Sequence, residues 1–149
     1  MSSDIDAIAA LIHEYAFRLD AGDLDGVAAL FEHAELGSTR HDRRYRGAGE
    51  ARTIYDNVII YDDGTPKTMH QITNVTVEVD GDRATSRCYF TVLAVTGQGL
   101  HPILGGEYRG HWRDDDGLEK VTRIVHVVGA LVVRYLMAHP LRASSDAHR

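Results

Sequence analysis

Cysteine, proline and long apolar runs are scarce in this sequence, and its 16 basic residues are outnumbered by 22 acidic ones. Its one cysteine, Cys88, excludes an internal disulfide and a metal site built from several cysteines, and it fits a reducing compartment, so we expect a cytoplasmic protein. No apolar run approaches the roughly 20 residues of a membrane-spanning helix, and the N-terminus lacks the basic start and apolar core of a secretory signal. The net charge of -6 gives no electrostatic reason to bind nucleic acid. We therefore expect neither a membrane nor a nucleic acid as a partner.

Motifs that hold phosphates or metals are missing as well. There is no glycine-rich phosphate loop after a strand, no Gly-x-Ser-x-Gly nucleophile motif and no dinucleotide fingerprint. The nine histidines include His111 and His126 on expected strands, but neither makes a convincing metal-binding spacing with another histidine or an acid. We therefore expect no metal site.

What is present is typical of one folded domain. The sequence is 44% hydrophobic and 26% charged, and 149 residues are enough to bury about two thirds of the unfolded surface. We find no repeat or linker, and we expect a single domain over residues 1–149, with a core over about 5–141 and a flexible tail over 142–149. The apolar end from Val132 to Leu141 is either a subunit contact or a capping helix.

The clearest pattern is a helix whose last turn carries an aspartate. Ser3 and Asp4 are suitable N-caps, and Gly22 suits the position after the helix end. Asp20 lies roughly 80° from the centre of an apolar stripe, so its carboxylate can face an apolar cavity. We expect Asp20 to take part in any chemistry. The stripe consists of Ile5, Ile8, Ile12, Tyr15 and Leu19.

After this helix the sequence predicts two more helices and then strands. Helical spacing covers 23–32 and 50–61, with a short strand or hairpin over 35–45 between them. From Lys67 the apolar period changes to two, and turn residues separate strands over 67–79, 84–95, 101–113 and 118–133. This order predicts an α+β fold in which the N-terminal helices pack in the concave face of a curved, mostly antiparallel sheet. The concave side of such a sheet is a natural pocket.

Among the histidines, His70 has the strongest case for a chemical role. It is in phase with Ile72 on the first long strand, so both side chains share one face. A neutral imidazole facing a cavity can take a proton, and a carboxylate bound to its other nitrogen fixes its tautomer and supports the charged form. Asp20 is the carboxylate that we expect there. The alternative is a core histidine bound to a backbone carbonyl.

Two further residues could act beside this pair. Tyr15 shares the helix of Asp20 and can donate a hydrogen bond to a substrate oxygen, or it is a buried aromatic residue with a satisfied hydroxyl. Arg123 is in phase with Val121 and Val125 on the last strand, and an inward-facing arginine needs an anionic partner.

In their order and spacing, several short motifs resemble the SnoaL-like branch of the nuclear transport factor 2-like superfamily. The resemblance covers roughly residues 5–127. It implies a cone-shaped α+β barrel with a deep pocket, commonly assembled as dimers or trimers. The motifs are Tyr15-x4-Asp20-Ala-Gly-Asp23, Leu30-Phe31, His70-x3-Asn74, Val79-Asp-Gly-Asp82-x-Ala84 and Gly106-x-Tyr108.

Scytalone dehydratase, the hexachlorocyclohexane dehydrochlorinase and the bile-acid 7α-dehydratase belong to this branch. They are cofactor-free lyases in which a histidine, supported by an aspartate on the first helix, abstracts a proton while a leaving group departs. The resemblance implies that His70 is the base and Asp20 its support, while Tyr15 and Arg123 bind developing negative charge or the leaving group. Scytalone dehydratase has a second pocket histidine on the strand that corresponds to residues 84–95, where this sequence has none.

We therefore expect a cofactor-independent lyase of the dehydratase type that acts on a small apolar cyclic molecule. Two alternatives stay open. In an isomerase related to ketosteroid isomerase, a carboxylate would move the proton, and Asp20 would matter at least as much as His70. The chain could instead be a non-catalytic ligand-binding or assembly domain, such as the small subunit of a ring-hydroxylating dioxygenase. The residues expected to form the substrate-binding wall are Tyr45, Tyr55, Tyr89, Leu93 and Ile103.

Overall fold

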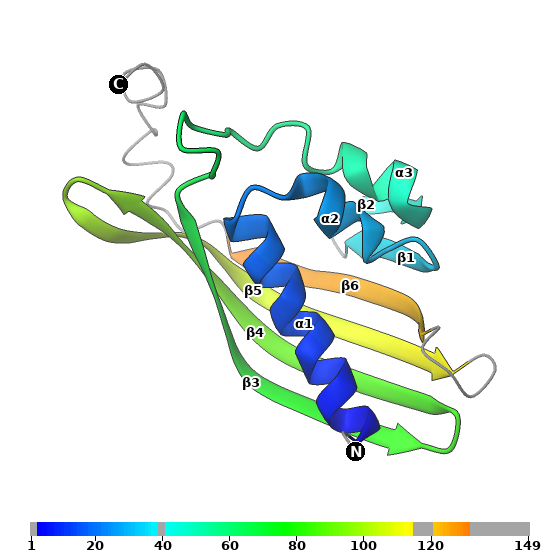
Figure 1. Ribbon diagram of the computed structural model, residues 1–149. Helices are drawn as coiled ribbons and strands as arrows, with labels where there is room; N and C mark the ends of the chain where they lie inside the picture. The colour runs from blue at the N-terminus through cyan, green and yellow to red at the C-terminus, as the bar shows by residue number, and fades with distance from the viewer. Residues whose placement is uncertain (1–2, 39–40, 115–120, 132–149) are drawn as a thin grey trace.

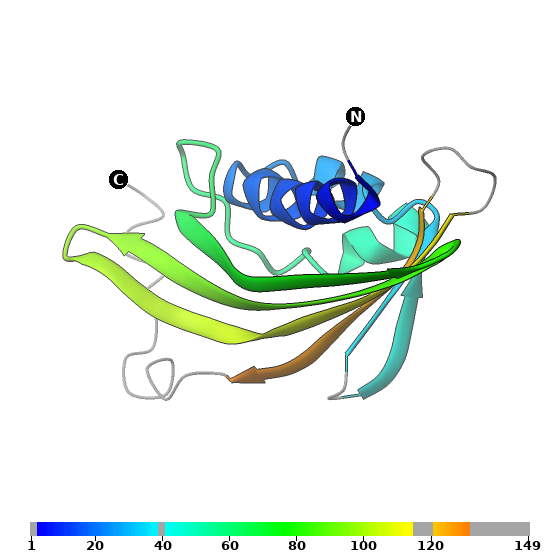
Figure 2. The ribbon, with the colours of Figure 1, turned by 90° about the horizontal axis from the view of Figure 1, so that it is seen from below.

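The computed structural model describes residues 3–38, 41–114 and 121–131, and in these ranges three helices lie on the concave side of a curved six-stranded sheet (Figures 1 and 2). The strand order is β2-β1-β6-β5-β4-β3; β1 and β6 are parallel, and the other neighbours are antiparallel. The fold class predicted from the order of the elements is confirmed. In chain order the elements are α1 (Asp4–Asp20), α2 (Leu24–Ala29), β1 (Ala34–Ser38), β2 (His41–Arg46), α3 (Gly47–Thr53), β3 (Thr68–Asp80), β4 (Arg83–Thr96), β5 (Gly99–Asp114) and β6 (Val121–Leu131).

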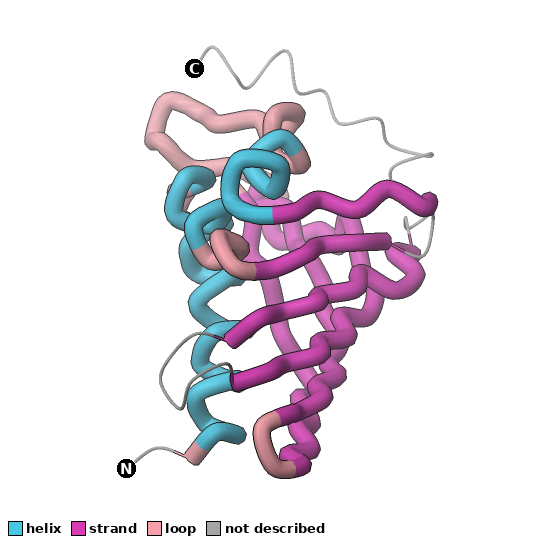
Figure 3. Tube along the Cα trace, turned by 90° about the vertical axis from the view of Figure 1, so that its right-hand side faces the viewer, coloured by secondary structure: helices cyan, strands magenta, loops and turns pink. Residues whose placement is uncertain are grey.

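Helix α1 lies across the sheet and is closest to β3 (Figures 1 and 3). A capping box starts it: the Ser3 hydroxyl accepts from the Asp6 backbone N–H, and the Asp6 carboxylate accepts from Ser3. Of the predicted stripe, Ile8 and Leu19 are buried, together with Ala16, and Ile12 and Tyr15 are partly buried, but Ile5 in the first turn is 47% exposed. The predicted helix is therefore confirmed to its last turn, where Asp20 ends it.

The third helix differs from its prediction. It spans Gly47–Thr53 rather than 50–61, and residues 54–57 form turns. Ile54 and Tyr55 still reach the core from these turns. Their apolar spacing therefore reflects contact with the core rather than a continuous helix. The β-branched run 58–60 disfavours helix continuation because such side chains lose rotamer freedom in a helix.

A β-bulge divides strand β3 into two halves. The register with β4 shifts between Thr73 and Thr76, and Asn74 has a positive φ of 56°, which asparagine tolerates better than most residues. Before the bulge the less exposed residues include His70 and Ile72, and after it they are Val75 and Val77. The bulge thus changes which alternate residues face the helices.

Two apolar clusters hold the helices on the sheet. The larger one surrounds Val27, which is fully buried, and joins α2 and α3 to β1 and the end of α1. The smaller one joins Ile8 near the start of α1 to Ala84 and Trp112 of the sheet. Within the described ranges, no helix is both long and apolar enough to cross a membrane. The predicted end of the core, the contact over Val132 to Leu141 and the tail over 142–149 lie outside the described residues.

Candidate functional site

Asp20 and His70 are in direct contact. The Asp20 Oδ1 atom lies 2.6 Å from Nδ1 of His70, and its Oδ2 atom accepts the backbone N–H of His70 at 2.7 Å. The Thr68 hydroxyl donates to Oδ1 at 2.9 Å. The carboxylate therefore accepts hydrogen bonds from both the side chain and the backbone of β3, and we call these two residues the Asp20–His70 pair.

The end of α1 reaches β3 because it packs closely against the loop before that strand. Gly22 has a φ of 77°, and a Cβ atom there would lie 2.1 Å from the carbonyl oxygen of Gly64. Only glycine permits this approach. The loop then passes through buried Pro66 and through Lys67, whose φ of 52° turns the chain into β3. This path places Thr68 and His70 beside the last residue of the helix.

The position of Asp20 is electrostatically unusual. A carboxylate at the C-terminal end of a helix meets the negative end of the helix dipole. The three hydrogen bonds from Thr68 and His70 offset this cost, and the side chain of His70 is only 8% exposed. Because the carboxylate can only accept, Nδ1 of His70 donates to it, and in the neutral ring the lone pair is then on Nε2. Among the described residues, Nε2 has no hydrogen-bond partner.

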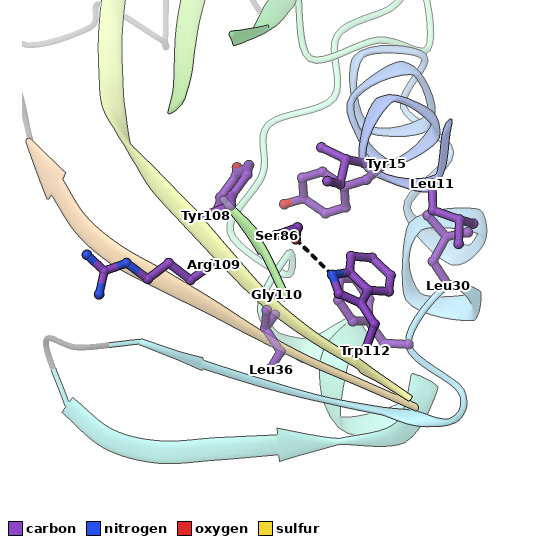
Figure 4. Close-up of a pocket in the computed structure, with 11 residues that line it drawn as sticks. Leu11, Tyr15, Leu30, Leu36, Ser86, Tyr108, Arg109, Gly110 and Trp112 are labelled. Atoms are coloured by element: carbon purple, nitrogen blue, oxygen red, sulfur yellow. Dashed lines mark hydrogen bonds between the residues drawn. The ribbon is translucent and has the colours of Figure 1, made fainter. Parts of the chain in front are cut away.

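An apolar pocket lies between the two core clusters, under α1 (Figure 4). Its cavity volume is about 50 Å³, and the pocket is partly open to solvent. Figure 4 shows Tyr15, Ser86 and Trp112 around the same space, while the guanidinium of Arg109 points away from it. The lining residues are Leu11, Ile12, Tyr15, Leu30, Phe31, Leu36, Ser86, Tyr108, Arg109, Gly110 and Trp112.

Three tyrosines, Tyr15, Tyr55 and Tyr108, meet at one end of this pocket, and we call them the tyrosine cluster. The hydroxyls of Tyr15 and Tyr55 are 3.1 Å apart, and Tyr15 also hydrogen-bonds Tyr108. Burial of the hydroxyl ends raises the pKa of Tyr15 and raises the pKa values of Tyr55 and Tyr108 well above 10. The charge of Asp20 adds to the raised pKa of Tyr15. All three phenols therefore keep their protons at neutral pH and can donate hydrogen bonds.

The Asp20–His70 pair does not line this pocket. His70 is paired with Val92 in β4, whereas the pocket residue Ser86 lies six residues away on that strand, about 20 Å along an extended chain. Tyr15 lies between them on α1 and contributes to the pocket. Tyr15, five residues before Asp20 on α1, is therefore the helix residue of the pocket that is nearest to the pair along the chain.

The structure does not bring Arg123 to His70. Its backbone pairs with Ala34 in β1 and with Trp112 in β5, whereas His70 is linked through Val92 to Leu104 of β5. Eight residues of β5 separate these two positions, or about 26 Å. The side chain of Arg123 lies outside the described residues. We therefore give it no part in the chemistry of His70.

None of the five residues predicted to form the binding wall lines the pocket. Tyr89 is 46% exposed between buried Cys88 and Phe90, because strand alternation turns it to the outer face, and Leu93 shares that face. Tyr45 is partly buried against the larger core cluster, and Ile103 lies at a bulge in β5. Tyr55 is buried and reaches the hydroxyl of Tyr15. Periodicity predicted the elements that carry these residues more readily than the direction in which each side chain would point.

The sequence analysis missed Ser86, Gly110 and Trp112 as pocket residues. A signal for them exists in β4, where the inward positions before the aromatic Phe90 are all small: Ala84, Ser86 and Cys88. Small residues in a strand leave space for a ligand or for a large side chain from a neighbour. Cys88 itself is unreactive, because burial raises the pKa of its thiol to about 11. Within the described part of the chain, no three side chains of the metal-binding types come together.

The chain belongs to the SnoaL-like domain family, whose profile matches residues 1–127. No curated protein matches it. Among solved structures, a protein of unknown function from Mycobacterium tuberculosis is 27% identical, with a TM-score of 0.63 over 82% of this chain and 70% of that one.

Two similar structures from Novosphingobium aromaticivorans are more distant in sequence. An NTF2-like protein with a cystatin-like fold is 20% identical, with a TM-score of 0.65 over 97% of this chain and 86% of that one. A candidate scytalone dehydratase is 18% identical, with a TM-score of 0.62 over 87% of each chain. At these identities the two structures confirm the NTF2-like α+β fold, and they say nothing about the reaction.

Proposed function

We propose that this chain is a cofactor-independent lyase of the dehydratase type, in which His70 removes a proton from carbon in a small apolar cyclic substrate. The contact of Asp20 with Nδ1 of His70 at 2.6 Å is the observation that supports this most directly. This contact leaves the lone pair of the neutral ring on Nε2. It also places the negative charge of Asp20 beside the ring, where it would stabilise the imidazolium.

The proposed reaction uses Tyr15 as the acid. When Nε2 of His70 takes the proton, the electron pair left on carbon forms the new double bond and expels the hydroxyl group. That oxygen takes a proton from the phenol of Tyr15, which its raised pKa keeps in place until then. The imidazolium then returns its proton to Tyr15 through the released water. The substrate would span the tyrosine cluster, with its oxygen at Tyr15 and its reacting carbon at His70.

The hydrogen bonds of Asp20 favour His70 over Asp20 as the base. Both carboxylate oxygens already accept donors from Thr68 and His70, and protonation of Asp20 would remove the negative charge that strengthens these bonds. The isomerase alternative, in which the carboxylate moves the proton, is therefore less well supported. A non-catalytic ligand-binding domain is the second candidate, and the specific observation in its favour is that neither Asp20 nor His70 lines the pocket.

A panel of cyclic ketones with a hydroxyl or a halogen on the β carbon tests the proposal. Loss of water or of the halide gives a conjugated enone, which is followed by ultraviolet absorbance, and carbon-bound proton exchange in D₂O is followed by NMR. We expect His70→Gln to lower turnover by about 10² to 10⁴, the usual contribution of a general base. His13→Gln is the matched control, because His13 is exposed on α1.

The outcome separates the three candidates. Equal turnover by His70→Gln and the wild type would refute the proposal. A larger loss in Asp20→Asn than in His70→Gln would support the isomerase alternative. Binding of panel members without turnover or exchange would support the ligand-binding domain.

A further inference from the structure

Ser86 is a buried polar residue in an apolar pocket. It is 8% exposed. Apart from the aromatic residues Tyr55 and Trp112, it is the one polar residue that is buried among the described residues. It lies on the concave face of β4, and the walls around it are mainly aliphatic and aromatic. A buried hydroxyl costs free energy unless its hydrogen-bonding capacity is used.

Among the residues that the structure describes, only part of that capacity is used. The indole Nε1 of Trp112 donates to Oγ of Ser86 at 2.8 Å, which occupies an acceptor site of the hydroxyl and holds it in place (Figure 4). For the hydroxyl proton, the described residues offer no acceptor. Trp112 thus orients the Ser86 hydroxyl, and its O–H group remains able to donate a hydrogen bond to a ligand in the pocket.

Gly110 keeps the space beside this hydrogen bond open. A Cβ atom at Gly110 would lie 2.5 Å from Oγ of Ser86 and 2.5 Å from Nε1 of Trp112. Both distances are far shorter than van der Waals contact, so a side chain at this position would displace the hydroxyl or the indole. The absence of a side chain lets Ser86 and Trp112 meet at the pocket wall.

We propose that Ser86 recognises the ligand, by donating a hydrogen bond to a neutral acceptor oxygen on an apolar ring. The ligand class is a ring ketone or ring ether rather than a carboxylate, because the pocket presents no cation within the described residues. Arg109 contributes to the lining, but its guanidinium points away and binds Glu107 at 2.9 Å (Figure 4). This inference rests on the proposed function only in taking the pocket as the place where the ligand binds.

Trp112 makes the test direct because it is the one tryptophan in the sequence. Its emission in the full-length protein reports binding of two probes of the same shape, 2-tetralone, which has a carbonyl acceptor, and tetralin, which has none. We expect the wild type to bind 2-tetralone about three- to tenfold more tightly than tetralin, as one hydrogen bond predicts. N-acetyltryptophanamide corrects for direct quenching by the ketone.

The variant Ser86→Ala should bring the ratio of the two dissociation constants to about one, with the tetralin constant changed less than threefold. Thr85→Ala is the matched control, since it removes a hydroxyl from the exposed face of the same strand and should keep the wild-type ratio. If loss of the Trp112 partner unfolds Ser86→Ala, Ser86→Cys keeps the size with a weaker donor and should also lower the ratio.

An unchanged ratio in Ser86→Ala would mean that water satisfies the hydroxyl, and it would overturn the inference. Failure of both probes to bind the wild type would overturn it as well. Neither result bears on His70, whose role is tested by turnover, so the two proposals fail separately.

Discussion

Raising the pH above 10 is expected to destabilise this protein through its buried tyrosines. In the folded state the tyrosine cluster keeps its protons, because burial raises the pKa values of all three phenols. In the unfolded chain these phenols ionise near pH 10. Above that pH the unfolded state binds fewer protons than the folded state, so stability falls as pH rises. The contribution is fully present below pH 10 and is lost between pH 10 and the folded-state pKa values.

The magnitude follows from linkage. Each phenol that stays protonated in the folded state costs about 1.4 kcal/mol of unfolding free energy for each pH unit above 10. Three such groups give an upper limit of about 4 kcal/mol between pH 9 and pH 11. Cys88, whose pKa burial raises to about 11, acts in the same direction. A typical domain is stable by only about 5–15 kcal/mol, so a loss of this size removes a substantial part of its stability.

Urea unfolding followed by circular dichroism at pH 9, 10 and 11 measures the loss. A pH jump followed at the tyrosinate absorbance should show a delayed phase that corresponds to three phenols and appears only as the protein unfolds. Tyr55→Phe should reduce both the delayed amplitude and the pH dependence by about a third. Tyr89→Phe, at an exposed tyrosine on the outer face, is the control. Stability that does not change between pH 9 and 11, or an equal slope in Tyr55→Phe, would refute the reasoning.

Two further substitutions test how the Asp20–His70 pair is held. Gly22→Ala should destabilise the protein by about 2 kcal/mol more than Gly64→Ala. Both positions have a positive φ, but only a Cβ atom at Gly22 would clash with the backbone. Thermal melting of both variants measures the difference. Thr68→Val removes one of the hydrogen bonds to Asp20, so we expect about 1 kcal/mol of lost stability and a turnover loss below tenfold on any compound that the wild type converts. A wild-type melting temperature in Gly22→Ala, or a Thr68→Val variant as inactive as His70→Gln, would contradict these expectations.

Local patterns in the sequence were enough to predict α1 and the succession of helices and strands along the chain. The caps at Ser3 and Gly22 and the three-four spacing between them determine where α1 begins, where it ends and where Asp20 lies. The phase of His70 with Ile72 placed the imidazole on the helix-facing side of β3. The contact between Asp20 and His70 combines these two local features, and its catalytic role stays a prediction.

Pairings between distant segments were beyond these patterns. Nothing in the sequence of Ala34–Ser38 indicates that it pairs in parallel with β6, because strand periodicity does not identify a partner. The pocket wall depends on such pairings: Ser86 meets Trp112 across the β4–β5 register, which only the assembled sheet establishes. The sequence analysis expected mainly large aromatic residues to form the wall, and it therefore did not predict that the small inward-facing residues of β4 line the pocket.

The bulge at Asn74 reverses the side-chain alternation of β3 between its two halves. On one side of it even-numbered residues face the helices, and on the other side odd-numbered residues do. Deleting Asn74 alone would restore an unbroken alternation, and either His70 or the pair Val75 and Val77 would then turn outward. The number of residues in this strand is thus as much a determinant of the site as their identity. A single-residue deletion here would reverse the orientation of half a strand without changing one remaining side chain.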